Sequence, residues 1–172
     1  MTQTRTYSAV VEMLSTGVTA SSPFIGLNLM TKVTEPTIMS YSSYDATHVF
    51  TIWGQRTDAA QTWAIVYRDG SGAASYWNGS TWGAYADCYS QLVALGTNYS
   101  LKFETNSTQI RALIDLYAYD DELYEWYWLN VVTTGWVNIS SLRSTSNLWL
   151  CGGDIVNDAW YGNAYIDEVV VS

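Results

Sequence analysis

Acidic side chains cluster at one place in this chain, where Asp120, Asp121 and Glu122 are followed by Glu125. Two carboxyl groups on either side of a glycosidic bond can hydrolyse it, one as general acid and the other as nucleophile or base. If the protein is an enzyme, the candidate catalytic residues are therefore Asp115, Glu122 and Glu125. A strand would place Glu122 and Glu125, three residues apart, on opposite faces. We therefore favour a solvated loop for this cluster.

Other reactive side chains are few. His48 is the only histidine, so a Ser-His-Asp or Cys-His site would have to use it, and no nucleophile motif surrounds it. One histidine and two distant cysteines, Cys88 and Cys151, argue against a zinc site. The two cysteines form one disulfide if the protein is exported and remain thiols if it is cytosolic.

Aromatic residues make up 15% of the chain, with 9 Trp and 14 Tyr against 3 Phe. Trp and Tyr combine a flat apolar face with a polar group, which suits half-wet surfaces on which sugar rings can stack. We expect about half of them in the core and several at the surface. The predicted carbohydrate-binding set is Trp126, Trp128, Trp77, Trp82, Trp63, Tyr67, Tyr124, Tyr117 and Trp53.

The alternation of residues along the chain predicts which aromatic residues of this set share a face of a strand. Tyr124, Trp126 and Trp128 are spaced by two, so a strand would align them as a platform of three rings. Trp63 and Tyr67 share one face of another expected strand. Tyr117, with its neighbour Tyr119, extends the face that carries Asp115.

The net charge is −9, with 16 Asp and Glu against 7 Lys and Arg. Such a field repels phosphate backbones, so we expect neither nucleic acid nor an anionic membrane as a partner. Acidic polysaccharides are disfavoured as well, whereas neutral glycans remain open. Lysine is scarce, which favours an extracellular, secreted protein. No signal peptide is visible ahead of the first strand pattern, and we expect a monomer tethered to other domains.

Proline is scarce and apolar residues mostly recur every second position, which predicts about ten or more short strands. Turns rich in Gly, Asn, Ser and Asp separate them, as is typical of a sandwich. The segment 120–130 also fits a helix face, but its aromatics favour a strand. A chain of 172 residues without a linker or repeat predicts one domain over 1–172. The expected strands span 6–14, 23–30, 37–44, 47–53, 61–68, 73–77, 82–88, 99–105, 108–119, 122–132, 146–151 and 162–171.

Several of these segments resemble a known family. Residues 98–104 and 109–115 resemble the paired central strands of concanavalin A-like domains, with the pattern Tyr-x-Leu-x-hydrophobic followed by Ile-x-hydrophobic-x-hydrophobic-Asp. Residues 148–153 and 165–169 resemble the last two strands of that superfamily, which includes lectins, glucanases, laminin G-like modules and carbohydrate-binding modules. The resemblance implies an all-β, antiparallel β-sandwich of the jelly-roll type, with one concave face that holds a polysaccharide.

The resemblance also implies a metal site. In several jelly-roll sugar binders an acidic residue that matches Asp167 helps to bind a structural calcium ion, and Glu12 on the neighbouring strand would assist it. The alternative for Asp167 is a carboxylate that bonds to backbone amides at the sheet end.

We predict a non-catalytic carbohydrate-binding module for a neutral polysaccharide, part of an extracellular multidomain protein that degrades glycans. The Glu-x-Asp-x-x-Glu signature of laminarinase-like hydrolases is absent, as are the usual lyase strand motifs. Two alternatives remain open, because this fold supports several functions. One is a glycoside hydrolase or polysaccharide lyase of the same fold, and the other is a structural or adhesive cell-surface domain.

Overall fold

The described part of the chain consists of strands and turns. The computed structural model describes residues 5–13, 23–30, 49–56, 61–68, 74–84, 96–106, 108–138, 147–154 and 164–171. These residues contain twelve strands and no helix, so none of them belongs to a helix that could span a membrane. Each strand pairing among them is antiparallel. This confirms the predicted all-β class with antiparallel sheets.

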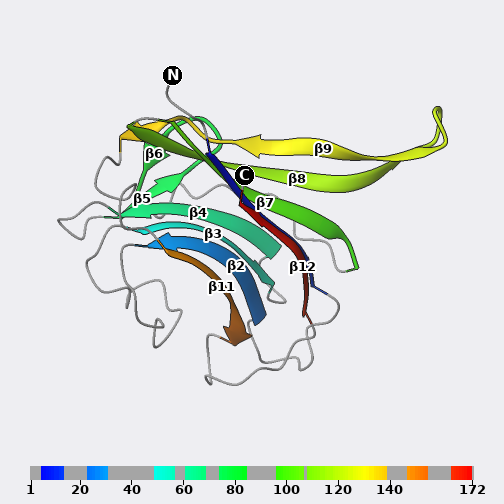
Figure 1. Cartoon of the computed structure of the whole chain (residues 1–172), viewed down its shortest axis with the longest axis horizontal. Coiled ribbons are helices and arrows are strands. Elements are labelled where there is room, and N and C mark those ends of the chain that lie inside the picture. Colours follow the sequence, from blue (N-terminus) through cyan, green and yellow to red (C-terminus); the bar gives the residue numbers. More distant parts are fainter. Residues whose placement is uncertain are drawn as a thin grey trace.

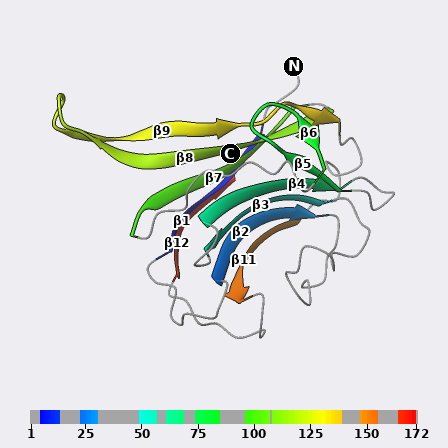
Figure 2. The same cartoon turned by 180° about the vertical axis from the view of Figure 1, so that it is seen from behind.

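The first sheet has the strand order β10-β8-β7-β1-β12, and β9 also pairs with β8. Its outermost hairpin, β8 and β9, extends well beyond the other strands in both views (Figures 1 and 2). The bounds are β1 Arg5–Met13, β7 Asn98–Thr105, β8 Gln109–Asp120, β9 Glu125–Thr133, β10 Val137–Asn138 and β12 Ala164–Val171.

The second sheet has the order β11-β2-β3-β4-β5-β6. The predicted strands 23–30 and 61–68 are confirmed to the residue. The expected strand 37–44 lies outside the described residues. The bounds are β2 Pro23–Met30, β3 Val49–Arg56, β4 Gln61–Arg68, β5 Ala74–Trp77, β6 Trp82–Gly83 and β11 Asn147–Asp154.

Buried residues of both sheets form one hydrophobic cluster. In β7 and β8 every second side chain enters it, as the period of two requires. The first sheet contributes Ala9, Val11, Tyr99, Leu101, Phe103, Ile110, Ala112, Ile114 and Val132, and the second contributes Leu27, Trp63, Ile65 and Trp77. The intervening residues of β7 and β8 therefore point away from the core, and we call this side the outer face of the first sheet.

A β-bulge in β9 determines which of its side chains reach the outer face. Ile114 pairs with Val132 but Asp115 pairs with Asn130, so Val131 is the extra residue. Val132 is buried in the core cluster, and Val131 packs against it. Beyond the bulge the alternation is reset, and Asn130 shares the outer face with Asp115.

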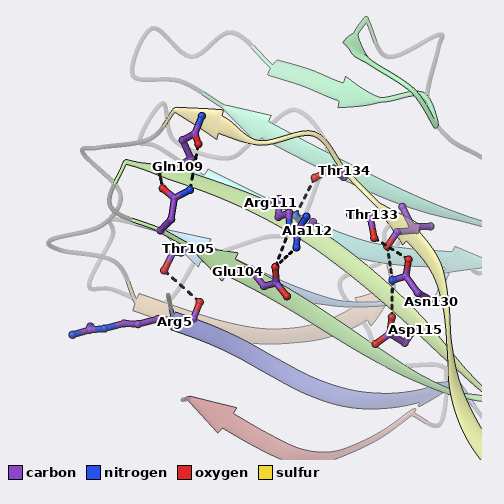
Figure 3. A network of polar contacts seen from close by, with 12 residues as sticks. Arg5, Glu104, Thr105, Gln109, Arg111, Ala112, Asp115, Asn130, Thr133 and Thr134 are labelled. Atoms are coloured by element: carbon purple, nitrogen blue, oxygen red, sulfur yellow. Dashed lines mark hydrogen bonds and ion pairs between the residues drawn. The ribbon is translucent and has the colours of Figure 1, made fainter. Parts of the chain in front are cut away.

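The two hydrogen bonds between Thr134 and Ala112 anchor the end of β9 beside β8. The Thr134 amide donates to the Ala112 carbonyl at 2.9 Å, and the Ala112 amide donates to Thr134 Oγ1 at 3.0 Å (Figure 3). Both residues are buried. We expect Thr134→Val, which keeps the shape but removes the acceptor, to lower the free energy of unfolding by about 1–3 kcal/mol.

Urea denaturation measures this loss, and Thr108→Val at an exposed position is the control. We expect the control to change stability by less than about 0.5 kcal/mol. Equal effects of the two substitutions would contradict the role of the buried Thr134 hydroxyl.

Candidate functional site

The distal half of the β8–β9 hairpin is a two-stranded ribbon. The pairing of β7 with β8 ends at Tyr99 and Leu116, and beyond this point the described residues pair β8 only with β9. We call residues 117–128 the ribbon; it is the part that projects in Figures 1 and 2. Because two strands alone are only marginally stable in water, the ribbon needs strong side-chain contacts.

Four aromatic rings on the outer face supply these contacts. Tyr117 lies opposite Trp128, and Tyr119 lies opposite Trp126. Tyr117 stacks on Trp126 with ring centroids 5.1 Å apart and planes 18° apart, and its centroid lies 4.9 Å from that of Trp128. Tyr119 and Trp126 are 5.3 Å apart. The order is therefore Trp128, Tyr117, Trp126, Tyr119, and we call this set the aromatic ladder.

The ladder remains accessible although its rings touch one another. Trp126 is 58% exposed and Trp128 is 41% exposed, and Tyr119 is also exposed. Tyr117, between the two Trp rings, is half-buried. A contiguous row of exposed rings is a candidate binding surface, since soluble domains seldom leave such a patch uncovered. The sequence predicts that Trp126 and Trp128 share a face of their strand and that Tyr117 shares the face of Asp115, and the strand register agrees with both. The register adds that these two faces are one.

A network of polar side chains lies at the base of the ladder, where the ribbon joins the sheet. The buried Asp115 carboxylate accepts a hydrogen bond from Asn130 Nδ2 at 2.7 Å (Figure 3). It also accepts one from the Lys102 ammonium. Asn130 Nδ2 also donates to the Val132 carbonyl at 3.2 Å, and Thr133 Oγ1 donates to Asn130 Oδ1 at 2.8 Å. The network thus ties β7, β8 and β9 together on the outer face.

The network has more hydrogen-bond acceptor positions than the donors described above occupy. Both amide hydrogens of Asn130 are used, but among the described residues its Oδ1 accepts only the hydrogen bond from Thr133 Oγ1. An ionised Asp115 carboxylate is acceptor-only and offers about four lone-pair positions to the two donors named above. Hydroxyl groups that approach the base of the ladder therefore meet the exposed Asn130 side chain beside an aromatic surface, while Asp115 itself is buried.

The turn at the tip of the ribbon corrects the predicted strand 122–132. Asp120 Oδ1 accepts hydrogen bonds from the amides of Glu122 at 2.8 Å and Leu123 at 2.9 Å, which closes a turn over 121–124. Tyr124 has φ 55°, in the left-handed region, and is exposed. Tyr124 is therefore not part of a strand platform with Trp126 and Trp128, and the sequence-based three-ring alignment was wrong at this residue.

Other residues of the predicted carbohydrate-binding set lie elsewhere. Trp63 is fully buried and Trp77 is 5% exposed, so we place both in the core and not in the candidate site. Trp82 packs against that core, with its ring 5.4 Å from Trp77 and 6.5 Å from Tyr67. The Tyr67 hydroxyl donates to the Asn138 carbonyl at 3.5 Å.

Trp53 has its backbone in β3, while its side chain lies outside the described part. The sequence shows the period of a strand but not which of its two faces meets the core. For this reason the sequence-based carbohydrate-binding set included Trp63 and Trp77, although both lie in the core.

The candidate catalytic carboxylates are spread along the hairpin. Asp115 lies at the base and Glu125 pairs with Asp120 near the tip, five strand residues or about 17 Å away. Glycosidases need their two carboxyl groups about 5–10 Å apart. Glu122 and Glu125 are both exposed at the free end of the ribbon, where no described element encloses them. The acidic cluster is thus an exposed turn followed by the start of β9.

The predicted calcium ligands occupy neighbouring strands. Glu12 pairs with Tyr165 and Val10 pairs with Asp167, so the backbone positions of Glu12 and Asp167 are diagonal neighbours on one face. No group of three or more His, Cys, Asp or Glu suited to a metal occurs among the described residues. Calcium at Asp167 stays a prediction. His48, Cys88 and the Cys151 side chain lie outside the described part.

Sequence reasoning missed Asn130 and Lys102 as members of the site. Their part in it depends on the bulge at Val131 and on the pairing of β7 with β8, which bring both side chains to Asp115. The available signal was the alternation of Lys102 with the apolar residues of β7, which places it on the outer face.

Comparisons of the chain with protein-family models, with curated proteins and with solved structures found no match. Its function must therefore be argued from the site.

The paired donors around Asp115 make a direct test possible. Asp115→Asn replaces one acceptor oxygen by an amide group that faces the donors of Lys102 and Asn130. We expect this change to lower the free energy of unfolding by about 2–3 kcal/mol in urea denaturation.

Glu104→Gln is the matched control, because Glu104 pairs with Arg111 and both side chains are about a quarter or more exposed. We expect Glu104→Gln to lower the free energy of unfolding by less than about 1 kcal/mol. An equal loss in the free energy of unfolding for Glu104→Gln and Asp115→Asn would show that the buried network stabilises the protein no more than an exposed ion pair does.

Proposed function

We propose that the protein binds a neutral polysaccharide on the outer face of the ribbon, as a non-catalytic carbohydrate-binding module. One observation carries the proposal: the exposed rings of the ladder continue into the acceptor-rich network of Asp115 and Asn130. Pyranose rings present C–H faces that stack on Trp, and their hydroxyls need hydrogen-bond partners at the rim. The ladder and the network supply these two requirements side by side.

The chemistry of the network favours a neutral ligand. Sugar hydroxyls donate hydrogen bonds, whereas a uronate or sulfate group brings only acceptors and a negative charge. Lys102, the cation beside the ladder, is already paired with Asp115. The net charge of −9 adds a repulsive field for acidic polysaccharides.

The proposed fold is a concanavalin A-like β-sandwich of the jelly-roll type, one domain over 1–172. Two antiparallel sheets that share one hydrophobic cluster support this arrangement. We place the module in an extracellular multidomain protein that degrades glycans, where it would raise the local concentration of substrate for an attached enzyme.

The spacing of the carboxylates favours binding over hydrolysis. Asp115 is separated from Glu125 by about 17 Å of strand, too far for a glycosidase pair. Asp115 is also buried and held by Lys102 and Asn130, as expected for a structural carboxylate that orients neighbours.

Affinity gel electrophoresis tests the proposal against a panel of xylan, β-glucan, mannan, a soluble cellulose derivative and pectin. We expect at least one neutral glycan to retard the protein, pectin not to retard it, and no reducing sugar to be released. Retardation that EDTA abolishes would assign calcium to the site. Absence of retardation on every gel, or release of reducing ends, would refute a non-catalytic module.

The ladder predicts which residues matter for affinity. We expect Trp126→Ala and Trp128→Ala each to weaken glycan binding by about 1–3 kcal/mol, or about 5- to 150-fold in Kd. Each change removes an exposed ring and leaves the core cluster intact. Gel retardation at several glycan concentrations gives the Kd values.

Trp136→Ala is the matched control, since Trp136 is also exposed but packs under the Arg111 guanidinium, 4.7 Å from its ring centroid, outside the ladder. We expect its glycan affinity to equal that of the unchanged chain. Unchanged affinity in the variant that lacks both Trp126 and Trp128 would show that the ladder is not the site.

A further inference from the structure

The turn between β5 and β6 contains the only place in the chain where a glycine directly follows an asparagine, Asn78-Gly79. Both residues are exposed, as are the other residues of the turn up to Thr81. The Asn78 amide donates to the Thr81 carbonyl at 3.0 Å, which closes the turn. In both views β5 and β6 lie at the end of the molecule away from the tip of the ribbon (Figures 1 and 2). The turn is therefore separate from the proposed glycan site.

Three hydrogen-bond donors surround the side-chain carbonyl of Asn78. Asn78 Oδ1 accepts from the Ser80 amide at 3.0 Å, from the Thr81 amide at 2.8 Å and from the Ser80 hydroxyl at 3.1 Å. Asn78 Nδ2 donates to Thr81 Oγ1 at 3.3 Å. Donors placed in this way stabilise the negative charge that develops on a carbonyl oxygen when a nucleophile adds to its carbon. The Asn78 side-chain amide is thus held in a setting that favours addition at Cγ.

The backbone nitrogen of Gly79 is the nucleophile nearest to Asn78 Cγ along the chain. Gly79 has φ 99°, and its amide makes no hydrogen bond among the described residues. Its amide proton is therefore open to base from the solvent. Glycine has no Cβ, so its nitrogen can approach the preceding side chain without the steric hindrance that other residues cause. Because both groups belong to one short segment, no second molecule has to be brought into position.

We infer that Asn78 is a site of spontaneous deamidation, at which the chain loses ammonia and gains a carboxylate. The Gly79 nitrogen loses its proton to base and bonds to Asn78 Cγ, while Oδ1 carries the negative charge. The carbonyl then re-forms, the bond from Cγ to Nδ2 breaks, and Nδ2 takes one proton from solvent and leaves as ammonia. One water molecule opens the resulting succinimide to aspartate or to isoaspartate, depending on which of its carbonyl carbons is attacked.

A second turn has similar hydrogen bonds but a different residue after its asparagine. Between β7 and β8 the Asn106 amide donates to the Gln109 carbonyl at 3.0 Å. Asn106 Oδ1 accepts from the amides of Thr108 at 3.0 Å and Gln109 at 2.9 Å. Asn106 is half-buried, and Ser107 follows it in the sequence. A side chain after the asparagine hinders attack by the next nitrogen, so Asn106 is an internal control for Asn78.

The two products differ in their effect on the hairpin. Aspartate keeps an acceptor oxygen for the donors of Ser80 and Thr81 and adds a negative charge to an exposed turn. Isoaspartate lengthens the backbone, because the main chain then runs through the former side chain. Trp77 directly precedes this point and pairs with Trp82, with their ring centroids 5.4 Å apart. Isoaspartate is therefore expected to disturb the pairing of β5 with β6.

Peptide mapping by mass spectrometry tests the inference on the full chain, kept folded in a mildly alkaline buffer and sampled over time. We expect the peptide that contains Asn78 to exchange an amide for a carboxyl group, while Asn106 stays unchanged. Conversion of Asn78 that is no faster than that of Asn106, or that occurs only when the chain is unfolded in urea, overturns the inference.

Two variants test the roles of the donors and of the glycine. Ser80→Ala removes the hydroxyl donor and keeps both amide donors, and we expect it to slow the conversion of Asn78 about two- to tenfold. Ser107→Gly creates an Asn-Gly pair in the second turn, and we expect Asn106 to become convertible. A rate that Ser80→Ala leaves unchanged, or an Asn106 that remains an amide in Ser107→Gly, contradicts the mechanism. No glycan is present, so the result is independent of the proposed binding function.

Discussion

The point along β8 at which its pairing with β7 stops is the constraint on which the rest of the candidate site depends. Up to Leu116, β8 lies between two strands and its inner side chains reach the core. Beyond Leu116 the hairpin loses its third strand, and hydrogen bonds between two strands in water contribute little net stability. The aromatic ladder compensates through three ring contacts, each of about 0.5–1.5 kcal/mol. The ribbon is therefore held by the residues proposed to bind the glycan.

The rings of the ladder therefore differ in their main role, which is either to hold the two strands together or to receive a ligand. Tyr117 contacts both Trp rings and is half-buried, so its main effect is to hold the two strands together. Trp126 and Trp128 keep free surface and can receive a ligand. Rigid rings whose positions are already fixed lose little conformational entropy when a sugar stacks on them. The buried Asp115 network serves the same end, because it fixes the base of the ladder against β7.

The sequence predicts the local features of this arrangement and misses those that depend on how strands meet. Alternation is enough to place Trp126 and Trp128 on one face of their strand and Tyr117 on the face of Asp115, and the strand 61–68 was predicted to the residue. Alternation does not reveal which face is buried, so Trp63 and Trp77 were candidates although they lie in the core. The bulge at Val131 and the point where β8 stops pairing with β7 arise from pairing between distant segments. No local sequence pattern encodes such pairing.

Charge and apolar surface are separated along the hairpin, and this separation favours a neutral ligand. Between Ala112 and Asn138 there is no Lys or Arg, and four of the five carboxylates in this segment lie from Asp120 to Glu125. The negative field of the chain would discourage random association and acidic ligands alike. The ladder and the edge of β9 are left nearly uncharged within that field. Neutral sugars are therefore a kind of partner that can approach β9 without a charge penalty.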